Sequence, residues 1–264
     1  MVQKFKPQED KAIAFVLAVH KLIGKHWNSS NPELASYIQD LAREQLSVDD
    51  LYAEEKRSAN ERLLADEAFW RHFINQSEDG FMTAAHLAVI GNIIDYGAHS
   101  LQGDLVQQIL SLYEKPLKLN EVEALKAAVR QADSILYLGD NAGEIFFDKL
   151  FIEQINHPKL TFATRGYPVI NDVTRQDALL MGLHQNGRVV DNGNAAPSTL
   201  LPWCSESFME CYHSADLIIS KGQGNFEGLM NEKHPNTFFM LIAKCRPIAQ
   251  LLHVDKGDML VTRL

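Results

Sequence analysis

Three clusters of polar residues each follow a short apolar run in the second half of the chain. "GDNAGE" (139–144) follows the first run, "TRGYPVINDVT" (164–174) the second, and "SKGQGNFEG" (220–228) a later one. Asp140, Asn141 and Asp172 offer two carboxylates and an amide oxygen, the hard ligands that suit Mg²⁺ or Mn²⁺ and leave positions open for water and substrate. Lys221, on a glycine-rich turn, is a cation that could neutralise a phosphoryl oxygen beside such a metal.

Each cluster also has an ordinary explanation. A "GDN" after a strand is often only a turn and helix cap, and Asn171 or Asp172 would make a normal N-cap for the helix that follows. The "KGQGNFEG" stretch could be a glycine-rich loop without chemistry. The coincidence of three clusters after three strands favours a site, because the carboxyl ends of parallel strands share one edge of a sheet.

Three further residues are candidates for substrate binding. Glu144 is either a first-turn carboxylate that the helix dipole stabilises or a group that faces the site and holds water there. Asn92 and Asp95, in "GNIIDYG", lie three residues apart on one predicted helical face. They either line a pocket or satisfy each other where two helices pack.

The elements that must position these residues change character near residue 134. The preceding part reads as helical throughout, and the stretch "FMTAAHLAVIGNIIDYGAHS" suits a closely packed central helix. The later runs "SILYLG", "LTFAT", "RVVDNG", "DLIISKG", "TFFMLI" and "DMLVT" read as strands, several of them separated by helices. We therefore predict an α/β fold, with a helical cap domain (1–125) packed on a mostly parallel, doubly wound sheet that forms the metal- and phosphate-binding domain (126–264).

Composition excludes several classes of protein. The formal net charge of −9, without a Lys/Arg-rich run, argues against nucleic-acid binding, and no stretch predicts a signal peptide or a membrane span. Three cysteines without CxxC spacing indicate neither a disulfide framework nor a zinc site, so we expect a reducing cytoplasm. HExxH, GxSxG and GxxxxGK[ST] motifs are absent, and a dinucleotide-binding fold is a weak alternative because "KGQGNF" is not GxGxxG.

The blocks "AVIGNIIDYGA", "GDNAGEIFFDKLFIEQI", "RGYPVINDVTRQDA" and "ADLIISKGQGNFEGL" together resemble the DUF89 family of metal-dependent damage-control phosphatases, in its compact prokaryotic branch with an ARMT1-like metal-binding domain. Their order and approximate spacing match over residues 88–229. The resemblance implies a helical N-terminal part joined to an α/β domain. It also implies that one divalent ion (Mn, Co, Ni or Mg) binds Asp140, Asn141 and Asp172, that Lys221 binds the substrate phosphate, and that Asn92 and Asp95 face the pocket.

The function expected is hydrolysis of small phosphorylated metabolites, such as sugar phosphates or damaged cofactor precursors, by metal-activated water. Asp140 and Lys221 would be the catalytic residues. Direct attack by Asp140 is the less favoured route, because haloacid-dehalogenase-type enzymes use DxDx[TV] and residue 142 is alanine. The alternative function is a non-catalytic module that binds a metal or a phosphometabolite. A carboxyl methyltransferase ranks low, since no adenosylmethionine-type glycine loop follows the first strand.

Overall fold

The computed structural model describes residues 2–94, 104–232, 234 and 236–264. Its strands are β1 Leu119–Asn120, β2 Ile135–Leu138, β3 Leu160–Thr164, β4 Arg188–Asp191, β5 Leu217–Lys221, β6 Thr237–Ile242 and β7 Met259–Thr262. Its helices are α1 Val2–Phe5, α2 Glu9–Lys25, α3 Asn31–Leu46, α4 Ala53–Leu64, α5 Glu67–Gln76, α6 Gly80–Ile94, α7 Leu105–Tyr113, α8 Val122–Gln131, α9 Ile145–Ile155, α10 Arg175–Leu180, α11 Glu206–Ser214, α12 Gly222–Leu229 and α13 Arg246–Leu251, with 3-10 turns η2 Leu183–Gln185 and η3 Leu201–Trp203.

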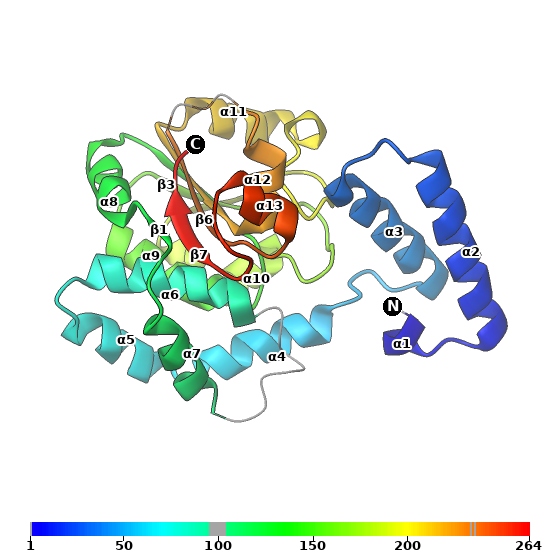
Figure 1. Cartoon of the computed structure of the whole chain (residues 1–264), viewed down its shortest axis with the longest axis horizontal. Helices are drawn as coiled ribbons and strands as arrows, with labels where there is room; N and C mark the ends of the chain where they lie inside the picture. Colours follow the sequence, from blue (N-terminus) through cyan, green and yellow to red (C-terminus); the bar gives the residue numbers. More distant parts are fainter. Residues whose placement is uncertain (1, 95–103, 233, 235) are drawn as a thin grey trace.

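The strands form one mixed sheet in the order β1-β7-β6-β5-β2-β3-β4 (Figure 1). Every pairing is parallel except that between β6 and β7, so the prediction of a mostly parallel sheet is confirmed. All six predicted runs are strands. The two-residue β1 was not predicted, and it places the first strand of the sheet before residue 125, ahead of the domain boundary suggested by the sequence.

Successive residues of the central strands point to opposite faces of the sheet. Ile135 and Tyr137 of β2 join a core with α5, α6, α8 and α9, whereas Leu136 and Leu138 join a second core with α11, α12 and α13. Both faces are therefore covered by helices, which explains why the strands read as continuous apolar runs. The sheet is doubly wound, as predicted.

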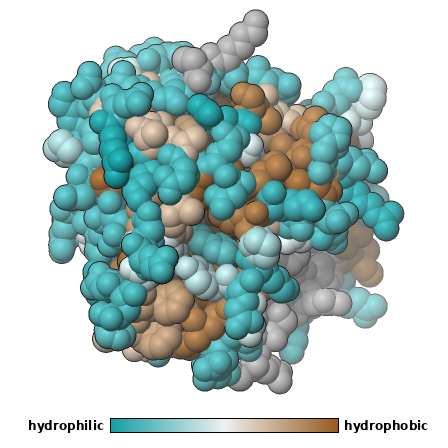
Figure 2. Space-filling view, turned by 60° about the vertical axis from the view of Figure 1, so that its left-hand side comes forward, coloured by the Kyte–Doolittle hydropathy of each residue, from teal (hydrophilic) through white to brown (hydrophobic). Residues whose placement is uncertain are grey.

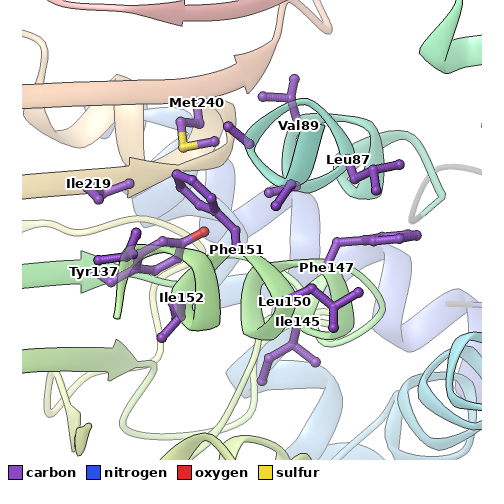
Figure 3. Packing of buried hydrophobic residues seen from close by; sticks show 14 of the residues in the cluster. Leu87, Val89, Tyr137, Ile145, Phe147, Leu150, Phe151, Ile152, Ile219 and Met240 are labelled. Atoms are coloured by element: carbon purple, nitrogen blue, oxygen red, sulfur yellow. The ribbon is translucent and has the colours of Figure 1, made fainter. Parts of the chain in front are cut away.

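Helix α9 lies in the middle of the first core. Figure 3 shows its side chains Phe147, Phe151 and Ile152 among residues of α6 and of the strands, with Tyr137 of β2 alongside. Eight of its eleven residues are buried, including the carboxylate of Asp148. A helix so completely enclosed is a rigid support for the turn between β2 and α9, which precedes it in the chain.

Helix α6 is the predicted central helix, and it packs along α9. A Cβ added at Gly91 would lie 3.0 Å from the Cβ of Glu144, so glycine is what permits this close approach. The helix consequently brings Asn92 against the turn that precedes α9.

The first helices lie to one side of the sheet (Figure 1), with α3 between α2 and the rest of the molecule. The Arg43 guanidinium of α3 donates to the Pro168 carbonyl at 3.0 Å. Lys56 of α4 is buried and pairs with Asp50 at 2.7 Å and with Asp177 of α10 at 2.9 Å. These contacts join the helical part to the segment that follows β3.

Figure 2 shows a face of the molecule that is mostly covered by hydrophilic side chains, with hydrophobic patches between them. Among the described residues, no helix is long and apolar enough to cross a membrane.

Replacing Lys56 with Met should lower the free energy of unfolding by about 2–3 kcal/mol, because two carboxylates would lose their shared buried cation. Arg57→Met is the matched control. Arg57 is exposed and lies 3.9 Å from Glu61, so its loss should cost less than about 0.5 kcal/mol. Urea denaturation of both variants measures the difference, and equal stabilities would contradict a structural role for the Lys56 pairs.

Candidate functional site

The strand order reverses direction between β2 and β5. From β2 the chain runs outward through β3 and β4 on one side, and through β5, β6 and β7 on the other. Ligands of open α/β sheets bind at such a switch point, outside the carboxyl ends of the strands. Asp140 and Asn141 follow β2 after a single glycine, Gly139, and Lys221 is the last residue of β5, so these predicted residues lie at the switch point.

The loop after β3 crosses the turn after β2 and pairs with it. Asn141 and Asp172 form an antiparallel β-bridge. The Val173 amide donates to the Asp140 carbonyl at 2.8 Å, and the Ala142 amide donates to the Asn171 carbonyl at 2.9 Å. The backbone thus brings together the three residues predicted to bind a metal, although Asp172 lies thirty-odd residues after the other two.

The helix-capping alternatives are wrong for all three residues. Helix α9 has Glu144 at its N-cap position, and α10 is capped by Thr174, which forms a capping box with Asp177. Neither Asp140 nor Asn141 caps a helix, and Asp172 lies two residues before the cap. Their buried side chains therefore have no capping role.

Arg165, which the sequence analysis missed, lies between the two carboxylates. Its Nε donates to Asp172 Oδ2 at 2.6 Å, and its Nη2 lies 3.6 Å from Asp140 Oδ1. The side chain is buried, and within the described part of the chain Nη2 has no hydrogen-bond partner. The sequence does place this arginine at a strand end, directly after the "LTFAT" run and seven residues before Asp172, and that position could have marked it as a site residue.

Asn92 and Glu144 close the buried side of the cluster. The Asn92 amide donates to Asp140 Oδ2 at 3.0 Å and to Glu144 Oε2 at 2.7 Å, so Asn92 contacts the site and not merely a neighbouring helix. Glu144 lies at the N-cap rather than one turn into α9, because the helix begins only at Ile145. Asp95 lies outside the described residues.

Burial raises the pKa of the Glu144 carboxyl group to about 8, although the nearby Lys221 ammonium opposes this rise.

Lys221 is fully buried below this cluster. Its Nζ donates to Asp148 Oδ1 at 2.5 Å and to the Ala88 carbonyl at 2.9 Å, and it lies 3.6 Å from Glu144 Oε1. Burial alone would lower the pKa of Lys221, but the Asp148 and Glu144 carboxylates outweigh it and raise the pKa. Contact between Lys221 and a phosphoryl group would therefore use its third proton or displace one of two present partners.

Asp148 and Tyr137 are the other residues of the site that the sequence analysis missed. The Tyr137 hydroxyl donates to Asp148 Oδ1 at 2.7 Å, the same oxygen that Lys221 contacts. Helix α9 carries four polar residues, Asp148, Lys149, Glu153 and Gln154, and of these only Asp148 is buried. Asp148 becomes a buried counter-ion because α9 packs under β2 and β5.

Gly222 fits against Asp140 so closely that no side chain is possible. Its φ is +77°, and an added Cβ would lie 1.8 Å from Asp140 Oδ2. Gly222→Ala should displace the Asp140 carboxylate, and we expect any activity that depends on this carboxylate to fall about a hundredfold. Gly257→Ala is the matched control, since Gly257 has a φ of +99° but nothing within 4 Å of the added Cβ. Both variants carry left-handed strain of about 1–2 kcal/mol, so a selective loss of turnover at Gly222 distinguishes contact from strain.

The donor chemistry fits a hard divalent cation. Asp140, Asn141 and Asp172 supply carboxylate and amide oxygens on two adjacent loops, and a cation bound there would share both carboxylates with the Arg165 guanidinium. No group of three or more His, Cys, Asp or Glu side chains among the described residues has the arrangement of a metal site. The candidate set contains two carboxylates and an amide, so it does not form such a group.

The doubly wound sheet, with acidic and amide residues at its switch point, makes this an open α/β protein with a candidate ligand site at the carboxyl ends of its strands. The chain belongs to the damage-control phosphatase ARMT1-like domain family, whose model matches residues 2–260. It is 37% identical over 186 residues to a damage-control phosphatase of Pyrococcus horikoshii, an alignment that covers 69% of this chain and 65% of that protein. It is 33% identical over 247 residues to a damage-control phosphatase of Archaeoglobus fulgidus, covering 90% of this chain and 85% of the relative.

A crystal structure of a DUF89 family protein from Pyrococcus horikoshii superposes with a TM-score of 0.88 at 30% identity, over 99% of this chain and 93% of that one. The predicted family and fold class are therefore confirmed. Membership of this family supports a phosphatase function.

Proposed function

We propose that the protein is a divalent-metal-dependent phosphatase for small phosphorylated metabolites, with its site at the switch point between β2 and β5. The observation that supports this most strongly is the β-bridge that joins Asn141 to Asp172, with Asp140 adjacent. It assembles an oxygen ligand set beside a buried guanidinium. A site for a phosphate monoester needs both, because the cation and the guanidinium neutralise charge on the phosphoryl oxygens.

Asp140, Asn141 and Asp172 would hold the cation, and oxygen donors of this kind accept Mn²⁺, Co²⁺, Ni²⁺ or Mg²⁺. When bound, the cation supplies Lewis acidity toward a phosphoryl oxygen and toward water. Asp140 suits a ligand better than a nucleophile, since its Oδ2 accepts from Asn92 and Asn141 while Arg165 faces its Oδ1. These contacts restrain its carboxylate, so the protein mainly positions the reacting groups.

Two cations are candidates for binding the substrate phosphate. The Arg165 Nη2 has no hydrogen-bond partner among the described residues, although it lies 3.6 Å from Asp140 Oδ1, and it suits a phosphoryl oxygen arriving between the two loops. Lys221, the residue predicted from the sequence, lies deeper and adds positive charge behind Glu144. Asn92 and Glu144 would orient the Asp140 carboxylate and a water molecule on the buried side of the site. Sugar phosphates and damaged cofactor precursors are the substrate classes we propose.

The test is a metal-dependence assay. The protein is stripped with a chelator, reloaded with Mn²⁺, Co²⁺, Ni²⁺ or Mg²⁺, and incubated with a panel of phosphosugars and an aryl phosphate while released phosphate is measured. We expect release that requires added metal. Tight binding of metal or phosphosugar without release would instead identify a non-catalytic module.

A further inference from the structure

A network of buried polar side chains extends from Arg165 to helix α12. Thr199 lies in the loop between β4 and η3, and Asn225 lies on α12. Arg165 Nη1 donates to the Thr199 hydroxyl at 3.5 Å, and that hydroxyl donates to Asn225 Oδ1 at 2.8 Å. Thr199 is 1% exposed and Asn225 is completely buried, so water does not compete for these hydrogen bonds.

Backbone groups fix the direction of each hydrogen bond in this network. The Asn225 amide nitrogen carries two protons, and it donates to the Gly139 carbonyl at 3.0 Å and to the Lys221 carbonyl at 2.8 Å. The amide oxygen of Asn225 must therefore face Thr199, and the single hydroxyl proton of Thr199 is committed to that oxygen. The hydroxyl has only lone pairs left, which accept from the Arg165 guanidinium.

The backbone of the loop holds Thr199 in place against α12. A Cβ added at Gly228 would lie 2.5 Å from the Thr199 carbonyl oxygen, and one added at Gly224 would lie 2.3 Å from the Pro197 carbonyl oxygen. The loop therefore lies directly on the helix, with no space between the two backbones. Thr199 is consequently a rigid support for the guanidinium.

The network fixes part of the Arg165 guanidinium and leaves another part open. Nε donates to Asp172 Oδ2 at 2.6 Å and Nη1 donates to Thr199, so two of its three nitrogens have partners. Nη2 is the third, and it has no hydrogen-bond partner among the described residues. Because the group is planar and held at two corners, its third corner has a fixed direction.

Asn225 also ties the arginine to the turn that carries two of the candidate metal ligands. Gly139, which accepts from Asn225, directly precedes Asp140, and Lys221 ends β5. One side chain thus joins the ends of β2 and β5, the two strands at the switch point. The position of the guanidinium relative to Asp140 is therefore set through Asn225 and Thr199, and not by two loops placed independently.

We propose that Thr199 and Asn225 are positioning residues, which direct Arg165 Nη2 toward the phosphate of the substrate. The inference rests on the proposed function and deepens it, because it assigns what orients the phosphate-binding arginine. Placement of this cation matters for phosphoryl transfer, in which the protein contributes mainly position and charge. Without the Thr199 hydroxyl, Asn225 Oδ1 would lose its donor and Arg165 Nη1 its acceptor.

Thr199→Val tests the proposal, because it removes the hydroxyl and keeps the branched shape of the side chain. In the protein loaded with the metal that supports phosphate release, we expect binding of inorganic phosphate to weaken about tenfold in a calorimetric titration, since one charge-assisted hydrogen bond is misdirected. Affinity for the metal should stay within about twofold. Thr199→Ser keeps the hydroxyl and should restore phosphate binding.

Ser198→Ala is the matched control. It removes a completely buried hydroxyl of the same loop, which donates to the Gly224 carbonyl of α12 at 2.7 Å instead of serving Arg165. It should leave phosphate binding within about twofold. Equal losses of phosphate binding in Ser198→Ala and Thr199→Val would mean that the loop is merely loosened, and would overturn the proposal.

A double variant shows whether Thr199 acts through Arg165. Arg165→Lys keeps a cation but lacks Nη1, so Thr199→Val should weaken phosphate binding less than about twofold further in that background. Additive losses would overturn the proposal, as would a Thr199→Val protein that binds phosphate like the unmodified chain. These outcomes leave phosphate release by the unmodified chain intact, whereas an unmodified chain that neither binds nor releases phosphate would refute the proposed function and this inference together.

Discussion

Replacing Asp140 with Asn, or Asp172 with Ala, is expected to reduce metal-dependent hydrolysis of a generic aryl phosphate by at least about a thousandfold. Each change removes a carboxylate from the set that would hold the cation, and the Lewis acidity that the cation supplies is worth several kcal/mol. The Asn141–Asp172 bridge is made by the backbone, so the loops should keep their pairing when either side chain changes. Circular dichroism should be unchanged.

The matched control is Asp216→Asn. Asp216 directly precedes β5, at the opposite edge of the sheet from the site, and its carboxylate accepts from the Ser134 hydroxyl at 2.7 Å. Its replacement should leave turnover within about twofold, since nothing at the switch point touches it. Direct calorimetric titration of the metal separates loss of binding from loss of chemistry. Full turnover in either Asp140→Asn or Asp172→Ala would refute the assigned ligand set.

Lys221→Met is expected to have the largest effect on stability, lowering the free energy of unfolding by about 3–5 kcal/mol. Lys221 and Asp148 are completely buried, and the ammonium is the cation closest to the Asp148 carboxylate, at 2.5 Å. Without it, burial would leave Asp148 with an uncompensated charge. Urea denaturation of the metal-free protein measures the loss.

The double variant Lys221→Met/Asp148→Asn distinguishes a structural from a substrate-binding role for Lys221. Removing the Asp148 charge as well should recover most of the lost stability, because the carboxylate that Lys221 contacts at 2.5 Å is then replaced by a neutral amide and no longer needs a counter-ion. If Lys221 also neutralises the phosphoryl group, turnover should stay low in this variant. Recovery of both stability and turnover would show that Lys221 acts only as a counter-ion within the fold.

Much of the fold could be predicted from local pattern. The six apolar runs after residue 134 are all strands, because residues buried on both faces of a sheet must be apolar in succession. Helix α6 was predicted from its small and apolar residues, and Gly91 within it proves to be the point where Glu144 approaches. The antiparallel pairing of β7 with β6 was not predicted, because strand direction depends on pairing with a strand elsewhere in the sheet.

The candidate site was predicted only in part. Asp140, Asn141 and Asp172 stand after strands in the sequence, so their convergence followed from the geometry of a parallel sheet. Arg165 looked like one more loop residue, and Asp148 like the polar position of an amphipathic helix. Their importance comes from burial: Arg165 bonds to the Asp172 carboxylate and Asp148 neutralises Lys221 only once the loop after β3 and helix α9 have packed.

The sequence by itself thus determined which segments become strands and helices and which polar residues stand at strand ends, because both depend on the order of neighbouring residues. Only the tertiary structure decided that β2 and β5 lie side by side at the switch point, that Asn141 pairs with Asp172, and that Lys221 is enclosed with Asp148. Those outcomes depend on contacts between residues distant in the chain, where burial decides whether a charge faces water or needs a partner.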